Sequence, residues 1–163
     1  MAQNPYQPPE APVADADPGL GSSVKAIVLG LLVDIGGTVI AGTALAIAWG
    51  IALGSSGASG EEINRFFRES STFMWVNVCL GLGFTGLGAY VAARTANRAE
   101  YRIALMLGLC SLAIGELMLR TMAGGGYPEW ARLVSNLLIL PVAFLGGHAR
   151  VLEKEYRAGK AQA

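Results

Sequence analysis

Hydrophobic residues gather in four long runs, separated by short polar or glycine-rich segments. The runs are Ala26–Leu53, Thr72–Ala93, Ile103–Ala123 and Trp130–Gly147. A helix that crosses a lipid bilayer needs about 20 mostly apolar residues, and each run is about that long or longer. The pattern therefore predicts an all-α, polytopic membrane protein: a four-helix transmembrane bundle within residues 24–149.

The segment between the first two runs predicts one further helix. Gly54–Gly60 is a flexible break of glycine and serine, and Ser59 followed by Glu62 is a capping-box pattern that starts a helix. The apolar residues that follow share one face, so we expect an amphipathic helix over about 60–70 at the outer membrane surface. An unbroken helix into the second run is the alternative, because no proline separates the two.

Both ends of the chain are polar. Residues 1–23 hold five of the seven prolines and predict a disordered, proline-rich cytoplasmic tail. Gly124–Pro128 predicts a turn before the fourth run, and Pro141 should kink that run. From residue 150 onward we expect a polar cytoplasmic tail, helical over His148–Lys160, with Glu153 and Arg157 spaced for an i,i+4 ion pair.

Composition and charge agree with this architecture. The chain is 53% hydrophobic and 15% charged, with mean hydropathy +0.45, whereas soluble domains carry about 25% charged residues. The net charge of zero gives no electrostatic case for nucleic acid, so the expected partner is the lipid bilayer. Of the twelve Lys and Arg residues, eight fall on the side of the two termini. By the positive-inside rule, both termini are predicted to be cytoplasmic.

Asp34 is the first candidate for function. It lies about ten residues into the first run, and a carboxylate in the middle of a bilayer is costly enough to be functional by default. Two structural alternatives stay open. Asp34 is protonated or hydrogen-bonded to Thr38, or the long first run slides outward and brings Asp34 close to the cytoplasmic headgroups.

A second group of polar residues falls at a common depth near the outer face. At helical rise, Thr38, Asn77, Glu116 and Asn136 come to a similar level, one from each run. Arg120, one turn beyond Glu116, is its predicted ion-pair partner. Such a layer is either an ion or substrate site or a set of interhelical hydrogen bonds that hold the bundle together.

Small residues repeat every four positions along the first two runs. The first stripe contains Gly42, Ala46 and Gly50, and the second contains Gly81, Thr85 and Ala89. Stripes of this kind let helix backbones approach closely in a membrane. We therefore expect these residues to pack against each other or across a homo-oligomer.

No pattern in the chain predicts catalysis, a cofactor or a metal. Gly81–Gly86 matches G-x-G-x-x-G, but it lies within an apolar run, with no strand before it, so a nucleotide site is rejected. The two cysteines do not form a C-x-x-C pair, and the one histidine, His148, has no partners at metal-ligand spacing. We therefore predict that the protein is not an enzyme.

The opening Asn4–Pro9 (NPYQPP), followed by four apolar runs, resembles small uncharacterised bacterial inner-membrane proteins with a proline-rich cytosolic leader. This resemblance implies a bacterial inner membrane and no known activity. The small multidrug-resistance transporters are similar in having four helices and an acidic residue in the first. This chain departs from them in its long tails and its outer helix, and it has Asp34 in place of their glutamate, so their activity is not carried over.

Two functional hypotheses follow. The first is a non-enzymatic accessory or scaffold protein of the inner membrane that associates with itself or another membrane protein through its small-residue faces. The alternative is a small, oligomeric transporter or proton-coupled carrier, with Asp34 as the titrating group and Glu116, Asn77 and Asn136 lining the route.

Overall fold

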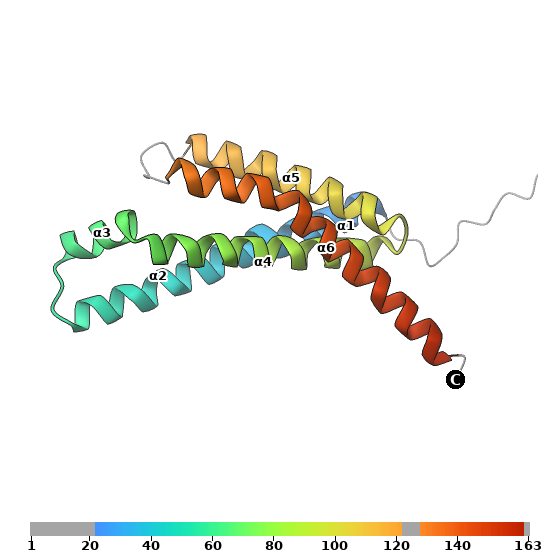
Figure 1. The fold of residues 1–163 in the computed structure, drawn as a ribbon, viewed down its shortest axis with the longest axis horizontal. Helices are drawn as coiled ribbons and strands as arrows, with labels where there is room; N and C mark the ends of the chain where they lie inside the picture. The colour runs from blue at the N-terminus through green and yellow to red at the C-terminus, as the bar shows by residue number, and fades with distance from the viewer. Residues whose placement is uncertain (1–21, 122–127, 162–163) are drawn as a thin grey trace, which may run out of the picture.

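The computed structural model describes residues 22–121 and 128–161, and all regular structure in these ranges is helical. The elements are α1 (Ser23–Leu31), a π-helical turn (Leu32–Gly36), α2 (Gly37–Ser55), α3 (Gly60–Glu69), α4 (Ser71–Ala96), α5 (Glu100–Thr121) and α6 (Glu129–Ala161). Within these ranges, four helical units are long and apolar enough to span a membrane, as predicted. Figure 1 shows them running back and forth between two ends.

We name these two ends by what they hold. The α3 end contains α3, the end of α2 and the start of α4. The terminal end contains the start of α1, the link between α4 and α5, and the C-terminal part of α6 (Figure 1). The start of α1 and the end of α6 therefore point to the same side of the bundle. The predicted tail over residues 1–23 falls outside the described residues, apart from Ser22 and Ser23.

The first predicted run forms one continuous helical unit over Ser23–Ser55. Its 33 residues correspond to about 50 Å at helical rise. The π-helical turn Leu32–Gly36 interrupts it and has Asp34 at its centre. Turns of this kind are rare and occur frequently at functional sites.

The predicted helix over about 60–70 is present as α3. The Ser59 hydroxyl accepts a hydrogen bond from the Glu62 backbone at 3.3 Å, and the Glu62 carboxylate accepts one from the Ser59 backbone at 2.7 Å. This second bond lowers the pKa of Glu62. Ser70 is extended (ψ 106°) and separates α3 from α4, so the alternative of an unbroken helix is wrong.

Aromatic side chains join the elements at the α3 end. Trp49 of α2 stacks on Phe66 of α3 with ring centroids 5.0 Å apart. Phe73 at the start of α4 packs against Phe67 at 4.8 Å. Trp75 of α4 and Trp130 of α6 also meet, at 4.9 Å. All three tryptophans therefore lie toward one end, as interfacial residues of a membrane protein do.

The core is made of small residues in close contact. Its fully buried members include Ala26, Ala89, Ala92, Ala104, Ala143 and one large side chain, Leu107. A Cβ atom on Gly146 of α6 would lie 2.3 Å from the carbonyl oxygen of Gly86 on α4. Close approach of this kind is typical of helices that associate within a membrane, where the hydrophobic effect does not drive association. In contrast, α2 buries none of its residues.

Helix α6 continues without interruption from Glu129 to Ala161, through Pro141 and the predicted tail. Figure 1 shows that it changes direction along its course, as expected for a proline inside a helix, and that its last part projects past the other helices. The predicted turn before it lies mostly outside the described residues. The fourth span and the polar tail are thus one helix.

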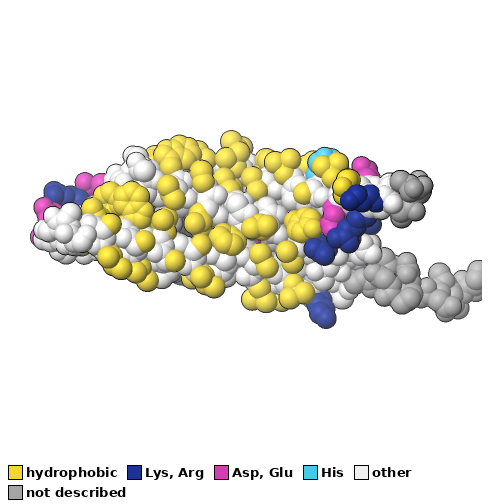
Figure 2. All heavy atoms as spheres, turned by 90° about the horizontal axis from the view of Figure 1, so that it is seen from below, with side chains coloured by type: hydrophobic (Ala, Val, Ile, Leu, Met, Phe, Trp, Pro, Cys, Tyr) yellow, Lys and Arg dark blue, Asp and Glu magenta, His cyan; other side chains and the backbone are white. Residues whose placement is uncertain are grey.

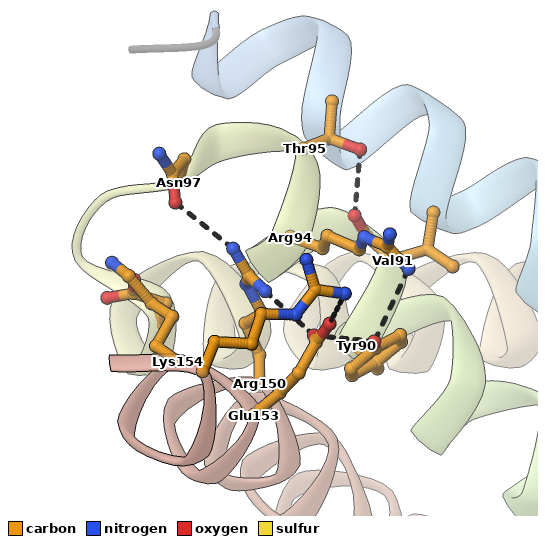
Figure 3. Close-up of polar contacts among 10 residues, drawn as sticks. Tyr90, Val91, Arg94, Thr95, Asn97, Arg150, Glu153 and Lys154 are labelled. Carbon is orange, nitrogen blue, oxygen red and sulfur yellow. Dashed lines mark hydrogen bonds and ion pairs between the residues drawn. The ribbon is translucent and has the colours of Figure 1, made fainter. Parts of the chain in front are cut away.

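Polar contacts at the terminal end tie α4 to α6 (Figure 3). The Tyr90 hydroxyl donates to the Glu153 carboxylate at 2.7 Å. Arg150 donates to the same carboxylate at 2.7 Å and to Asn97 Oδ1 at 3.2 Å. The predicted pair of Glu153 and Arg157 is present, at 2.5 Å. Asn97 adopts a left-handed conformation (φ 50°) that ends α4.

The surface between the two ends is apolar. Ile40 is 73% exposed and Leu137 is 75% exposed, and many other large hydrophobic side chains share this exposure. Figure 2 shows hydrophobic side chains along the length of the bundle and charged groups gathered at its two ends. A contiguous apolar surface of this extent is rare on soluble monomers and marks a site of membrane or protein contact.

Candidate functional site

The Asp34 side chain is buried among helices although it carries a carboxylate. The residue is only 3% exposed. The Thr85 hydroxyl of α4 donates to Asp34 Oδ1 at 2.9 Å, and the Ser111 hydroxyl of α5 donates to Oδ2 at 2.5 Å. Both carboxylate oxygens therefore have a partner, and these partners are Thr85 and Ser111, not Thr38, which the sequence left open as one alternative. The site joins the π-helical turn to two other helices.

Glycines explain how this contact forms. A Cβ atom on Gly88 would lie 2.6 Å from the carbonyl oxygen of Gly30 and 3.0 Å from the Cβ of Asp34. Since no side chain is present at position 88, the backbone of α4 lies directly against the first helical unit. Thr85, one turn earlier on α4, then reaches the Asp34 carboxylate.

Asp34 forms part of the wall of a cavity of about 240 Å³. Five other polar residues from α2, α4, α5 and α6 also line it: Thr38, Asn77, Thr85, Ser111 and Ser135. Most of the remaining wall is aliphatic, including Ile114 and Ile139. Known ligand pockets have this character, mostly apolar with a few placed polar groups.

Asn77 contributes mainly its side-chain oxygen to this region. Its amide group donates to the carbonyl of Phe73 in its own helix at 2.9 Å. A Cβ atom on Gly42 of α2 would lie 3.5 Å from the Asn77 side-chain oxygen. The oxygen is thus directed toward α2, the element that also supplies Thr38 to the cavity wall.

The predicted polar layer divides into two separate groups. Asp34, Thr38 and Asn77 share the cavity. The Glu116 carboxylate instead accepts two hydrogen bonds from Arg132 of α6, at 2.9 and 2.7 Å, and one from Asn136 at 2.6 Å. Neither Glu116 nor Asn136 lines the cavity. This second group holds α5 and α6 together.

Arg120 is therefore not the ion-pair partner that the sequence predicts for Glu116. Among the described residues, that partner is Arg132. The reason is geometric: α5 and α6 run antiparallel, so a residue near the start of α6 lies opposite the last turns of α5. A planar guanidinium facing a carboxylate makes two hydrogen bonds at once, which a neighbour on the same helix does less readily.

No protein-family model matches this chain, and neither a curated protein nor a solved structure matches it. Any functional argument therefore rests on the site. Within residues 22–121 and 128–161, no group of three His, Cys, Asp or Glu side chains is placed to hold a metal ion. Cys79 and Cys110 are both free thiols.

The two small-residue stripes have different surroundings. On α4, Thr85 and Ala89 are buried, and Gly81 lies near Thr38, whose methyl group is 3.8 Å from a Cβ built on that glycine. On α2, Gly42 and Ala46 are half-buried. A Cβ atom on Gly50 would meet nothing within 4 Å. The α4 stripe thus packs inside the bundle, whereas the far part of the α2 stripe is open.

Sequence reasoning missed several members of the site. The sequence predicts only a packing role for Thr85, and no pattern marks Ser111, Ser135 or Arg132 as a site residue. One signal for Ser111 is present in the sequence: it is the only hydroxyl residue in the third run before Glu116. Hydroxyl groups in such runs often bond within their own helix, so this signal does not identify a partner.

Proposed function

We propose that this chain is an integral membrane protein of the bacterial inner membrane, with both termini in the cytoplasm. The distribution of polar and apolar residues is the reverse of that in a soluble protein, which supports membrane insertion: many large apolar residues are exposed, while Asp34, Thr85 and Ser111 are buried. The eight basic residues at the terminal end, against four toward the α3 end, support the orientation. The resemblance of the NPYQPP opening to bacterial inner-membrane proteins supports the location.

Reporter fusions test this orientation. A reporter that is active only outside the cytoplasm should be active when inserted after Gly57, near the α3 end, and inactive when inserted after Arg98, in the link between α4 and α5. Activity in the reverse pattern would contradict the cytoplasmic placement of the termini.

We propose further that the protein is a carrier for a small solute, coupled to proton movement at Asp34. The observation that carries this proposal is the buried Asp34 carboxylate in the wall of the cavity. A carboxylate in such surroundings must be compensated by a proton, a counter-charge or hydrogen bonds. A residue of this kind inside a spanning segment typically marks a route for ions or substrates.

The hydroxyl partners suit a group that changes its protonation state. Serine and threonine hydroxyls both donate and accept hydrogen bonds. Thr85 and Ser111 donate to the carboxylate, and the same hydroxyl oxygens can accept from the protonated acid. The Thr85 hydroxyl also lies 3.1 Å from the Gly81 carbonyl, a second acceptor for its proton. Asp34 therefore keeps hydrogen-bond partners with or without its proton.

The cavity indicates the class of solute. Its volume of about 240 Å³ is slightly below the range of about 300–1,000 Å³ for drug-sized ligands. An aliphatic wall with one carboxylate favours a small, mostly apolar cation that replaces the proton on Asp34. Thr38, Asn77 and Ser135 would contact the solute, while Glu116 and Asn136 would hold the helices rather than line the route.

Uptake into proteoliposomes tests the carrier function. Tetramethylammonium is a suitable probe because it is small and apolar and cannot cross the bilayer as a neutral amine. We expect uptake when the lumen is more acidic than the outside, with release of protons from the lumen, and we expect a protonophore to stop it. Uptake no faster than in protein-free liposomes would count against this solute class.

A second candidate function is supported by the exposed face of α2. This helix buries none of its residues, and Gly50 within its small-residue stripe meets nothing in the same chain. Such a face would let the protein act as a scaffold that associates with a second copy or another membrane protein. Disulfide crosslinking of Gly50→Cys in native membranes should trap a dimer or a mixed adduct, and recovery of monomer alone would argue against it.

A further inference from the structure

The C-terminal part of α6 extends beyond what is needed to cross a bilayer. Its 33 residues correspond to about 50 Å at helical rise, against a hydrocarbon core of about 30 Å. The predicted fourth span ends at Gly147, and the helix continues for more than three further turns. Figure 1 shows this part leaving the other helices at an angle.

An apolar stripe continues along this extension. Leu145 at the end of the span is 60% exposed, and beyond it Leu152 and Tyr156 are 51% and 65% exposed. At 100° per residue, these three side chains fall within about 40° of one another around the helix. The apolar stripe of the span thus carries on past the predicted end of the membrane.

Contacts with the bundle fix which way this stripe points. The flank of α6 that carries Arg150 and Glu153 bonds to Asn97 and Tyr90 of α4 and its C-terminal cap (Figure 3). Lys154 pairs with Glu100 at the start of α5, at 2.6 Å. Since these residues face the bundle, Leu152 and Tyr156 face away from it. In the described part of the chain, the stripe therefore stays largely exposed.

Basic side chains lie along one side of the stripe. The Lys160 ammonium group lies 5.0 Å from the centre of the Tyr156 ring, and the side chain of Arg157 is 65% exposed. The described residues at the terminal end include eight basic side chains, against three acidic ones: Glu100, Glu153 and Glu155. An apolar stripe bordered by Lys and Arg is typical of helices that lie at the surface of an anionic membrane.

We propose that residues 148–160 of α6 form an amphipathic helix that binds the anionic lipid surface of the cytoplasmic leaflet. Leu152 and the Tyr156 ring enter the boundary between headgroups and acyl chains. Lys160 reaches the lipid phosphates and strengthens the contact about fivefold. Arg157 turns the donors that its ion pair with Glu153 leaves open toward the same phosphates. This inference rests on the proposed membrane placement, but not on the carrier function.

Quenching by nitroxide-labelled lipids tests it in the reconstituted full-length protein. In a Cys79→Ala/Cys110→Ala background, a fluorescent label is attached at Tyr156→Cys or at Leu145→Cys within the span. Glu155→Cys is the control, about 100° from Tyr156 and about 60° from Leu152 around the helix. A label at Leu152→Cys repeats the measurement with Tyr156 in place. Vesicles contain phosphatidylcholine alone or with about one third phosphatidylglycerol.

We expect strong quenching at positions 145, 152 and 156 and weak quenching at position 155. Phosphatidylglycerol should raise the quenching at 152 and 156 several-fold, and Arg157→Gln/Lys160→Gln should remove that increase. Quenching at 145 without an excess at 152 and 156 over 155 would overturn the inference and leave the membrane placement intact. Absence of quenching at all four positions would overturn both.

One further result would also overturn the proposal. Labels at 152 and 156 that are shielded from lipid nitroxides and from aqueous iodide alike would show that a protein covers the stripe.

Discussion

Gly146→Val is expected to prevent the bundle from assembling. A Cβ atom at this position would lie 2.3 Å from the carbonyl oxygen of Gly86 and 2.9 Å from the Cβ of Ala89. Both atoms belong to α4 and neither is the end of a flexible side chain, so α4 and α6 would have to separate. Overpacking of a core costs about 1–3 kcal/mol, and occasionally more. We expect the upper end of that range or beyond, because backbone must move.

Gly83→Val is the matched control. Gly83 lies on α4 in the same apolar region, and a Cβ atom there would meet nothing within 4 Å. Thermal unfolding in detergent, followed by the loss of the monodisperse elution peak, compares the two variants. The control should melt close to the native protein, while the Gly146 variant should melt far lower or fail to purify. Equal melting temperatures would show that the close contact of α4 and α6 is wrong.

Asp34→Asn is expected to abolish proton-coupled uptake of tetramethylammonium. The amide has nearly the volume of the acid, and the Thr85 and Ser111 hydroxyls can still donate to its oxygen or accept from its nitrogen. The fold should therefore survive. However, an amide carries no negative charge to bind a cation, and it neither gains nor loses a proton at physiological pH. Uptake should therefore fall to the rate of protein-free liposomes.

Glu116→Gln separates this effect from a general loss of carboxylates. Glu116 contacts Arg132 and Asn136 rather than the cavity, so its replacement should leave coupled uptake in place even where it loosens the packing of α5 on α6. Uptake that persists in the Asp34→Asn variant would remove Asp34 from the coupling role. Loss of uptake in both variants, with the fold intact, would show that the route does not follow the cavity at Asp34 as proposed.

The helices themselves follow from the sequence because their signals are local. An apolar run of about 20 residues defines a candidate span wherever it lies in the chain. The capping box of Ser59 and Glu62 marks the start of α3 to the residue, since both hydrogen bonds are made within one turn. The break at Ser70 could not be read in the same way, because no glycine or proline marks it.

The partners of the candidate site depend on how the helices are rotated and how closely they approach. Asp34 could be singled out from its position alone, but its bonds to Thr85 and Ser111 cross 51 and 77 residues of chain. They require the close contact between Gly30 and Gly88. The spacing of small residues along the sequence does not show which two helices will meet at such a contact. For the same reason, Glu116 pairs across to α6 rather than along its own helix.

The π-helical turn at Leu32–Gly36 inserts an additional residue into an otherwise regular helix. Without it, everything after the turn would be rephased by about 100° relative to α1. Thr38 and the rest of α2 would then point away from the cavity while Gly30 still lay against α4. One residue in this turn thus sets the rotation of α2 relative to α1. Deletion of Leu32, Val33 or Gly36 would therefore dismantle the cavity while leaving every side chain that lines it unchanged.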